Sequence, residues 1–115
     1  MSKHFITFGA GDNKYINAGN RLCKQANDCK LFDNIELYGK TQLQNNNDFW
    51  KKHRFFIEKN SRGFGYWLWK PFLIKKKIET MNEGDILLYL DCGCEIDVQK
   101  KTELEKSFKV IIDDK

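Results

Sequence analysis

Short apolar runs alternate along the chain with longer stretches that carry apolar residues at every third or fourth position. Residues 5–8 are a β-prone run that ends at a glycine-rich turn, and Asp12 suits the N-cap of a helix that follows. Residues 13–30 carry apolar positions at steps of three or four, as one buried face of a helix requires. Residues 35–38 alternate between apolar and polar positions. The pattern predicts a strand, a helix and a second strand parallel to the first.

Three more helical patterns follow in the rest of the chain. Bulky residues within 49–57 lie on one side of a helix that follows the polar segment 45–48. Pro71 fits the first turn of a helix over residues 72–81, because a proline at that position removes no helical hydrogen bond. Residues 100–108 form the last predicted helix.

Residues 85–91, Asp-Ile-Leu-Leu-Tyr-Leu-Asp, are continuously apolar between two aspartates rather than alternating. A strand of this kind is covered on both faces, which predicts the middle of an α/β sheet. Residues 110–112 predict an edge strand. Together the elements predict an α/β fold of three layers with a mostly parallel sheet.

The composition predicts that these elements form one folded domain. The chain has 115 residues, of which 41% are hydrophobic and 14% aromatic, so we expect a single domain over residues 1–115.

The net charge of +4 comes mainly from lysine, without arginine clusters, and we expect no nucleic-acid partner. The longest purely apolar run, residues 86–90, is too short to span a bilayer, and the first residues lack the apolar core of a signal peptide. We expect a cytoplasmic protein, in the host cytoplasm if the source is viral.

Cysteines at positions 23, 29, 92 and 94 are expected to be reduced thiols in that compartment. Their spacings, C-x5-C and C-x-C, differ from the C-x2-C pairs of structural zinc sites. Zinc is therefore a minor alternative, and Cys23 and Cys29 are interpreted as small apolar residues on a helix.

Segments at the carboxyl ends of predicted strands are candidates for chemistry, since ligands of open α/β sheets bind there. The first is Gly9-Ala10-Gly11, which lacks the third glycine of a dinucleotide fingerprint and by itself favours a tight turn. The second is residues 91–97. If this segment continues extended, Asp91, Glu95 and Asp97 point to one side, and such oxygen ligands suit Mg²⁺ or Mn²⁺ on a diphosphate. A turn with solvated acids explains the same residues equally well.

Residues 61–71, Ser-Arg-Gly-Phe-Gly-Tyr-Trp-Leu-Trp-Lys-Pro, combine aromatic rings, glycines and cations in a loop before a helix. Trp67 and Trp69 could fill the core, as most tryptophans do. Arg62 and Lys70 flank them, however, and aromatic faces with cations at a helix start suit a sugar, a base or a phosphate. Both interpretations stay open at this point.

Three of these segments together resemble a known family. They are the strand end Thr7-Phe8-Gly9, the block 62–71 and residues 84–96, Gly-Asp-Ile-Leu-Leu-Tyr-Leu-Asp-Cys-Gly-Cys-Glu-Ile. Over about residues 3–97 the chain is similar to the N-terminal, nucleotide-sugar-binding half of GT-A-type glycosyltransferases, most of all to a poorly characterised group found in bacteria and giant viruses. The resemblance implies half of a GT-A or Rossmann-like fold. In such enzymes a strand ends in an Asp-x-Asp motif that binds Mn²⁺ or Mg²⁺ on the diphosphate of the sugar nucleotide.

By that resemblance, Asp91 is the first motif aspartate and Gly93 stands in the second motif position, so Glu95 or Asp97 would have to complete the metal shell. The resemblance implies a UDP- or GDP-linked sugar as the substrate and Mn²⁺ or Mg²⁺ as the cofactor. The residues expected to bind substrate are Thr7, Gly9, Arg62, Tyr66, Trp67, Trp69 and Lys70.

The resemblance covers only the donor-binding part of such an enzyme. Eighteen residues follow Asp97, whereas the acceptor-binding half of a GT-A enzyme lies beyond this motif. We therefore expect a shortened domain that binds a nucleotide sugar, with slow donor hydrolysis and no efficient transfer. The main alternative is a catalytically inactive binding or interaction module, which predicts self-association or a partner chain at the shortened side. A nucleotide-binding protein without sugar chemistry is a third interpretation.

Overall fold

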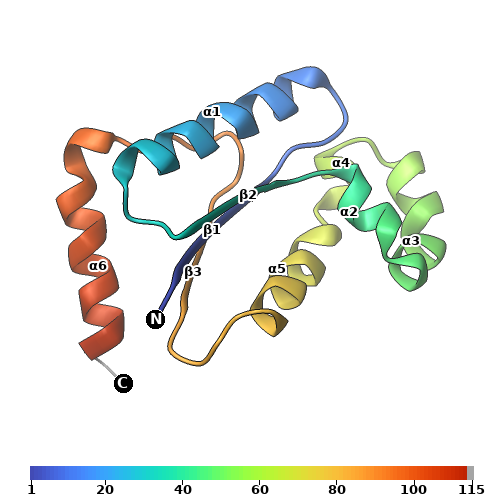
Figure 1. Ribbon diagram of the computed structural model, residues 1–115. Helices are drawn as coiled ribbons and strands as arrows, with labels where there is room; N and C mark the ends of the chain where they lie inside the picture. Colours follow the sequence, from blue (N-terminus) through green and yellow to red (C-terminus); the bar gives the residue numbers. More distant parts are fainter. Residues whose placement is uncertain (114–115) are drawn as a thin grey trace.

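The computed structural model describes residues 1–113 and places a parallel sheet between two layers of helices (Figure 1). The strands are β1 (Lys3–Phe8), β2 (Asn34–Tyr38) and β3 (Ile86–Tyr89), in the order β2-β1-β3. The helical elements are α1 (Asn13–Cys29), α2 (Lys40–Asn45), α3 (Asn47–Lys59), α4 (Gly63–Tyr66), α5 (Trp69–Glu79), the 3-10 turn η1 (Val98–Lys100) and α6 (Lys101–Asp113). The predicted α/β fold with a parallel sheet is confirmed.

Both neighbours of β1 run parallel to it, with Phe5 opposite Ile35 of β2 and Leu88 of β3. Successive side chains of a strand point to opposite faces of the sheet. Phe5 accordingly packs with Leu22 of α1 on one face, whereas Phe8 belongs to a second core on the other face. The sheet therefore separates two apolar clusters.

Helix α1 lies along one face of the sheet (Figure 1). Its start is fixed by Asp12, whose carboxylate accepts a hydrogen bond from the backbone N–H of Lys14 at 3.0 Å. Gly19 allows the helix to approach β2 closely, because a Cβ at this position would lie 2.5 Å from a methyl group of Leu37. Helix α6 contacts the loop after α1, with the ring of Phe108 edge-on to Phe32 at 5.8 Å between centroids.

Helices α2, α3 and α5 cover the opposite face (Figure 1). Their buried residues pack together with Phe8 at the end of β1, and they are Leu43, Phe49, Ile57, Trp69 and Leu73. This second core places the loop between α3 and α5 beside the carboxyl end of the sheet. None of the helices in residues 1–113 combines the length and the apolar character that crossing a bilayer requires.

The prediction that residues 85–91 form the middle of the sheet is wrong. Among the described residues β1 is central, and β3 pairs with β1 alone. The continuous apolar run arises because both faces of β3 are covered: Leu88 and Leu90 pack on the α1 side, and Tyr89 packs on the other. A strand can be covered on both faces of the sheet and still pair with only one neighbouring strand.

The prediction of an edge strand at residues 110–112 is also wrong, because these residues continue α6 to Asp113. Leu104, Phe108 and Ile112 recur at steps of four and are the less exposed positions along this part of the helix. This spacing places one apolar stripe on one helix face, which outweighs the strand preference of the β-branched side chains.

Candidate functional site

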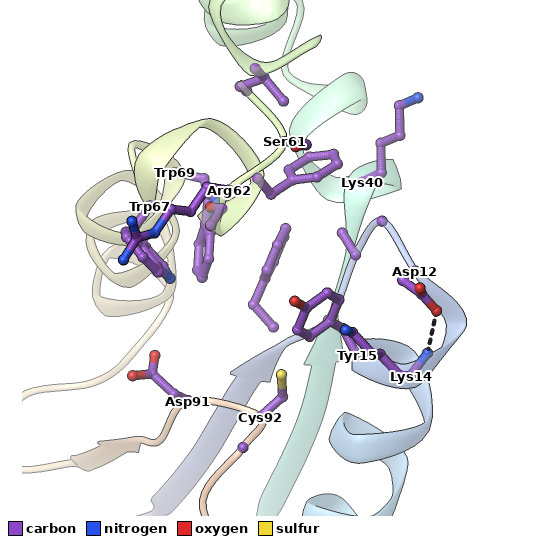
Figure 2. A pocket seen from close by; sticks show the side chains of 18 of the residues that line it. Asp12, Lys14, Tyr15, Lys40, Ser61, Arg62, Trp67, Trp69, Asp91 and Cys92 are labelled. Atoms are coloured by element: carbon purple, nitrogen blue, oxygen red, sulfur yellow. Dashed lines mark hydrogen bonds between the residues drawn. The ribbon is translucent and has the colours of Figure 1, made fainter. Parts of the chain in front are cut away.

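The strand order creates a crevice at the carboxyl ends of β1 and β3. After β1 the chain crosses to β2 on one side, and it later returns to the other side of β1 as β3. Ligands of open parallel sheets bind where the connections diverge in this way. A cavity of about 860 Å³ opens here, lined by the loops after β1 and β3 and by the α3–α5 region (Figure 2). Its volume lies in the range of small-molecule sites, about 300–1,000 Å³.

The loop after β1 forms one wall of the cavity. Its backbone is fixed at Gly9, whose N–H donates to the carbonyl of Tyr38 at 2.9 Å. A Cβ at Gly9 would lie 2.6 Å from the carbonyl oxygen of Tyr15, so only glycine lets the loop close onto the first turn of α1. Lys14 and Tyr15 of the first turn of α1 border the cavity, and the hydroxyl of Tyr15 points into it (Figure 2).

The opposite wall contains a left-handed turn of the backbone. The φ angles are 60° at Gly63, 51° at Phe64, 87° at Gly65, 51° at Tyr66 and 61° at Trp67. Left-handed backbone costs about 1–2 kcal/mol at each residue other than glycine. Strain of this kind concentrates at functional sites, where packing around it holds the conformation. The turn therefore marks this loop as a site candidate independently of its composition.

The two tryptophans of the loop have different surroundings. Trp69 is 4% exposed, stacks on Phe8, and donates its indole N–H to the carbonyl of Gly63 at 3.0 Å. Trp67 is 44% exposed and covers Gly63, where a Cβ would lie 2.5 Å from the indole ring. Both border the cavity. Trp69 belongs to the core, whereas Trp67 leaves part of its ring accessible to a ligand.

An ion pair lies at the end of β3. The ammonium of Lys70 is 2.8 Å from Oδ1 of Asp91, and the hydroxyl of Tyr89 donates to the same oxygen at 3.0 Å. The hydrogen bond from Lys70 lowers the pKa of Asp91. Burial, with the Asp91 carboxylate adding to it, raises the pKa of Tyr89. Near neutral pH this cluster holds a charged carboxylate, an ammonium and a protonated phenol.

The chain turns immediately after this ion pair instead of continuing extended. The N–H of Cys94 donates to the carbonyl of Asp91 at 2.9 Å, and Arg21 of α1 donates to the carbonyls of Cys92 and Cys94 at 3.2 and 2.7 Å. The Cys92 thiol points into the cavity (Figure 2). Burial raises the pKa of this thiol, so it stays protonated and is a poor nucleophile.

The turn separates the three carboxylates that the sequence places on one side. Asp91 borders the cavity, whereas Glu95 is 71% exposed with its Oε1 3.8 Å from Arg21, and Asp97 caps η1 by accepting from the N–H of Gln99 at 3.0 Å. Within residues 1–113 no three His, Cys, Asp or Glu side chains are grouped so that they could hold a metal ion. The condition of an extended 91–97 segment is therefore not met, and the three carboxylates do not share one side. Binding of Mn²⁺ or Mg²⁺ itself stays a prediction.

The structure places the predicted substrate-binding residues in two groups. Those that border the cavity are Gly9, Arg62, Trp67 and Trp69. Thr7 is fully buried and donates its hydroxyl to the carbonyl of Leu90 at 2.7 Å, so it links β1 to the end of β3. Tyr66 is 53% exposed and lies outside the cavity lining. Lys70 also lies outside the lining, and its ion pair with Asp91 is its link to a lining residue.

Several lining residues were not predicted from the sequence, and they are Lys14, Tyr15, Lys40, Trp50, Phe64 and Tyr89. Lys14 and Tyr15 lie in the first turn of the helix that follows the glycine turn, so their position in the chain was a usable signal. Lys40 and Trp50 come from α2 and α3, with the ammonium 5.8 Å from the ring centroid, and no local motif marks them. Packing of the helices alone brings this pair to the cavity.

The fold and the cavity together define the class of the molecule: an α/β protein with a cavity at the switch point of a parallel sheet. Comparison of the chain with protein-family models, curated proteins and solved structures finds no match.

Proposed function

We propose that the cavity binds the nucleoside diphosphate part of a UDP- or GDP-linked sugar, in a glycosyltransferase-like domain. The observation that carries this proposal is the position of the cavity at the switch point between β1 and β3, walled by Gly9 on one side and Asp91 on the other. This is the place where parallel α/β sheets bind nucleotides.

The side chains around the cavity suit both parts of a nucleotide. Lys14, Lys40 and Arg62 are exposed cations at its border, and such groups bind phosphate oxygens. Tyr15 and Trp67 add partly exposed rings, which suit the flat face of a base or a sugar. A ligand that is aromatic at one end and anionic at the other matches this combination.

Sugar transfer would break the bond between the anomeric carbon and a diphosphate oxygen, and the bond electrons would leave with the diphosphate. The guanidinium of Arg62 and the ammonium groups at the border would stabilise the charge that develops on this leaving group. The acceptor oxygen would form the new bond to the anomeric carbon and lose its proton.

A binding module without transfer activity is the second candidate. It is favoured by the partners of the acidic side chains, because Glu58 pairs with Arg54 and Asp91 pairs with Lys70, so neither is a free base for an acceptor. Such a module would act through a partner or a second copy. Val110 and Ile111, which are 62% and 51% exposed on α6, are candidates for that contact.

Calorimetric titration with UDP, GDP, UDP-glucose and GDP-mannose tests the proposal. We expect at least one of them to bind with a Kd below about 1 mM, and Arg62→Gln to weaken binding on the order of tenfold. Lys51→Gln, an exposed residue of α3 outside the lining, is the matched control. Release of nucleoside diphosphate from the sugar nucleotide separates an enzyme from a binding module. No binding of any nucleotide by the folded chain would contradict the proposal.

A further inference from the structure

Every acidic side chain that borders the cavity already has a partner. Asp12 caps the N-terminus of α1. Glu58 lies 3.0 Å from the guanidinium of Arg54, and Asp91 lies 2.8 Å from the ammonium of Lys70. Arg54 and Lys70 themselves stay outside the cavity lining. Glu58 and Asp91 are therefore compensated by cations outside the lining, and Asp12 is held by a backbone N–H.

The cations of the lining are in the opposite situation. Lys14, Lys40 and Arg62 form no ion pair with any other residue in 1–113. Lys14 and Lys40 lie only over aromatic rings, at 5.1 Å from the centroid of Tyr15 and 5.8 Å from that of Trp50. Three cationic side chains thus border the cavity without an ion-pair partner in residues 1–113, and this excess of positive charge favours an anionic ligand.

The contacts of Asp91 oppose its use as a metal ligand. Its Oδ1 accepts from Lys70 and from the hydroxyl of Tyr89, and the ammonium also lies 5.3 Å from the centroid of the Tyr89 ring. A divalent ion on this carboxylate would lie within a few ångströms of the ammonium, and the two positive charges would repel each other. The ammonium already compensates the negative charge of Asp91.

We infer that the cavity binds a nucleoside diphosphate directly through its lysine and arginine side chains, without a divalent metal ion, because Lys70 compensates the Asp91 carboxylate. The inference rests on the proposed function and differs from the metal-bridged binding that the sequence predicts. It assigns two roles: Lys14, Lys40 and Arg62 neutralise the diphosphate, and Lys70 removes the repulsion that an unpaired Asp91 would exert on it.

The test is calorimetric titration of the whole chain with UDP and with GDP, in excess EDTA and again in excess MgCl₂ or MnCl₂. We expect the Kd of the better ligand to differ by less than about threefold between the chelator and either metal. Lys70→Gln should weaken binding on the order of tenfold in EDTA, and Mn²⁺ should recover most of that loss by bridging Asp91 to the diphosphate.

The double variant Lys70→Gln/Asp91→Asn separates charge from packing. It removes both members of the ion pair, so binding in EDTA should return to within about threefold of the parent, and Mn²⁺ should have no effect. Lys75→Gln, an exposed residue of the same helix, is the matched control. Circular dichroism of each variant shows that it is folded.

The outcomes are distinguishable. If the parent chain binds a nucleoside diphosphate only with Mg²⁺ or Mn²⁺, the metal-free mode is wrong while the proposed function stands. If the parent binds neither nucleotide in any condition, the proposed function and the inference both fail. Binding in EDTA that Lys70→Gln leaves unchanged would overturn the role of Lys70.

Discussion

The ring of Phe8 stacks on the indole of Trp69, with 3.8 Å between the ring centroids and 22° between the ring planes. Phe8 is the last residue of β1, and Trp69 is the first residue of α5. The stack therefore attaches the loop that walls the cavity to the end of the central strand. The indole N–H extends this attachment by its hydrogen bond to the carbonyl of Gly63. The shape of the site depends on core packing at this point.

Substitution of Trp69 should destabilise the fold. Trp69→Ala removes a buried ring and should reduce the free energy of unfolding by about 3–5 kcal/mol. Trp69→Phe keeps an aromatic ring against Phe8 but removes the indole hydrogen bond to the carbonyl of Gly63, which keeps the N–H of Trp67 as a donor, for a loss of about 0.5–1.5 kcal/mol. Urea denaturation followed by circular dichroism measures both values. A loss below about 1 kcal/mol for Trp69→Ala would show that the stack does not hold the loop.

Trp67 should report on ligand binding. Its ring is 44% exposed at the cavity, so bound nucleotide should change its fluorescence emission. Trp67→Phe should abolish most of that change and alter the free energy of unfolding by less than about 1 kcal/mol. Titration of UDP and GDP against the parent and the variant gives the comparison. An unchanged response in Trp67→Phe would assign the signal to another tryptophan and remove Trp67 from the site.

Two glycines at the cavity should tolerate a methyl group differently. Gly9→Ala places a Cβ 2.6 Å from the carbonyl oxygen of Tyr15, so the loop must shift, at a loss of about 1–3 kcal/mol of stability and with weaker nucleotide binding. Gly93→Ala is the matched control, because no atom lies within 4 Å of its added Cβ. It should change stability by less than about 0.5 kcal/mol. Thermal unfolding of both variants tests this, and equal effects would contradict the close approach at Gly9.

The elements of the fold could be predicted where hydrophobic periodicity determines them. The strand before Gly9, the helix capped by Asp12 and the strand at residues 35–38 all appear as predicted. The order of the strands could not be predicted, because residues 86–90 are apolar on both faces whether they have one neighbouring strand or two. Helix α2 was also missed, since Leu43 is its only buried residue and gives no repeating pattern.

The site could be predicted only in part, for a related reason. Gly9, Arg62 and Trp67 belong to short motifs that already suggest ligand binding, and they do border the cavity. The 91–97 carboxylates would converge only on an extended backbone, whereas the chain turns there. Arg21 donates hydrogen bonds to the carbonyls of this turn, and it lies about seventy positions away in the sequence. Local spacing carries no information about a contact of that range.

The other end of the sheet predicts an acid-sensitive contribution to stability. The carboxylate of Asp85 accepts from the N–H of Ser2 at 2.8 Å, from His4 at 3.0 Å and from the N–H of Asn82 at 3.1 Å. These hydrogen bonds lower the pKa of Asp85 from about 3.8 to about 2. The folded state therefore favours the charged form. Its contribution to stability is present above about pH 4 and is lost as the pH falls toward about 2.

Asp85→Asn should remove this dependence. The variant should be less stable than the parent at neutral pH, and the difference between them should shrink as the pH falls from about 4 to about 2. Urea denaturation at a series of pH values measures the difference. Asp28→Asn, an exposed position on α1, should keep the acid profile of the parent. A difference that is constant with pH would show that the hydrogen bonds do not favour the charged carboxylate.

The most direct test of nucleotide binding at the switch point is a titration of the ¹⁵N-labelled chain with UDP and GDP, followed by amide NMR. The cavity is lined by residues within the segments 8–15, 61–69 and 89–93, together with Lys40, Trp50, Ile57 and Glu58. The account predicts saturable shift changes concentrated in these segments, with little change around Asp85 at the opposite end of the sheet. Absence of shift changes at saturating nucleotide, or changes centred elsewhere on the chain, would contradict it.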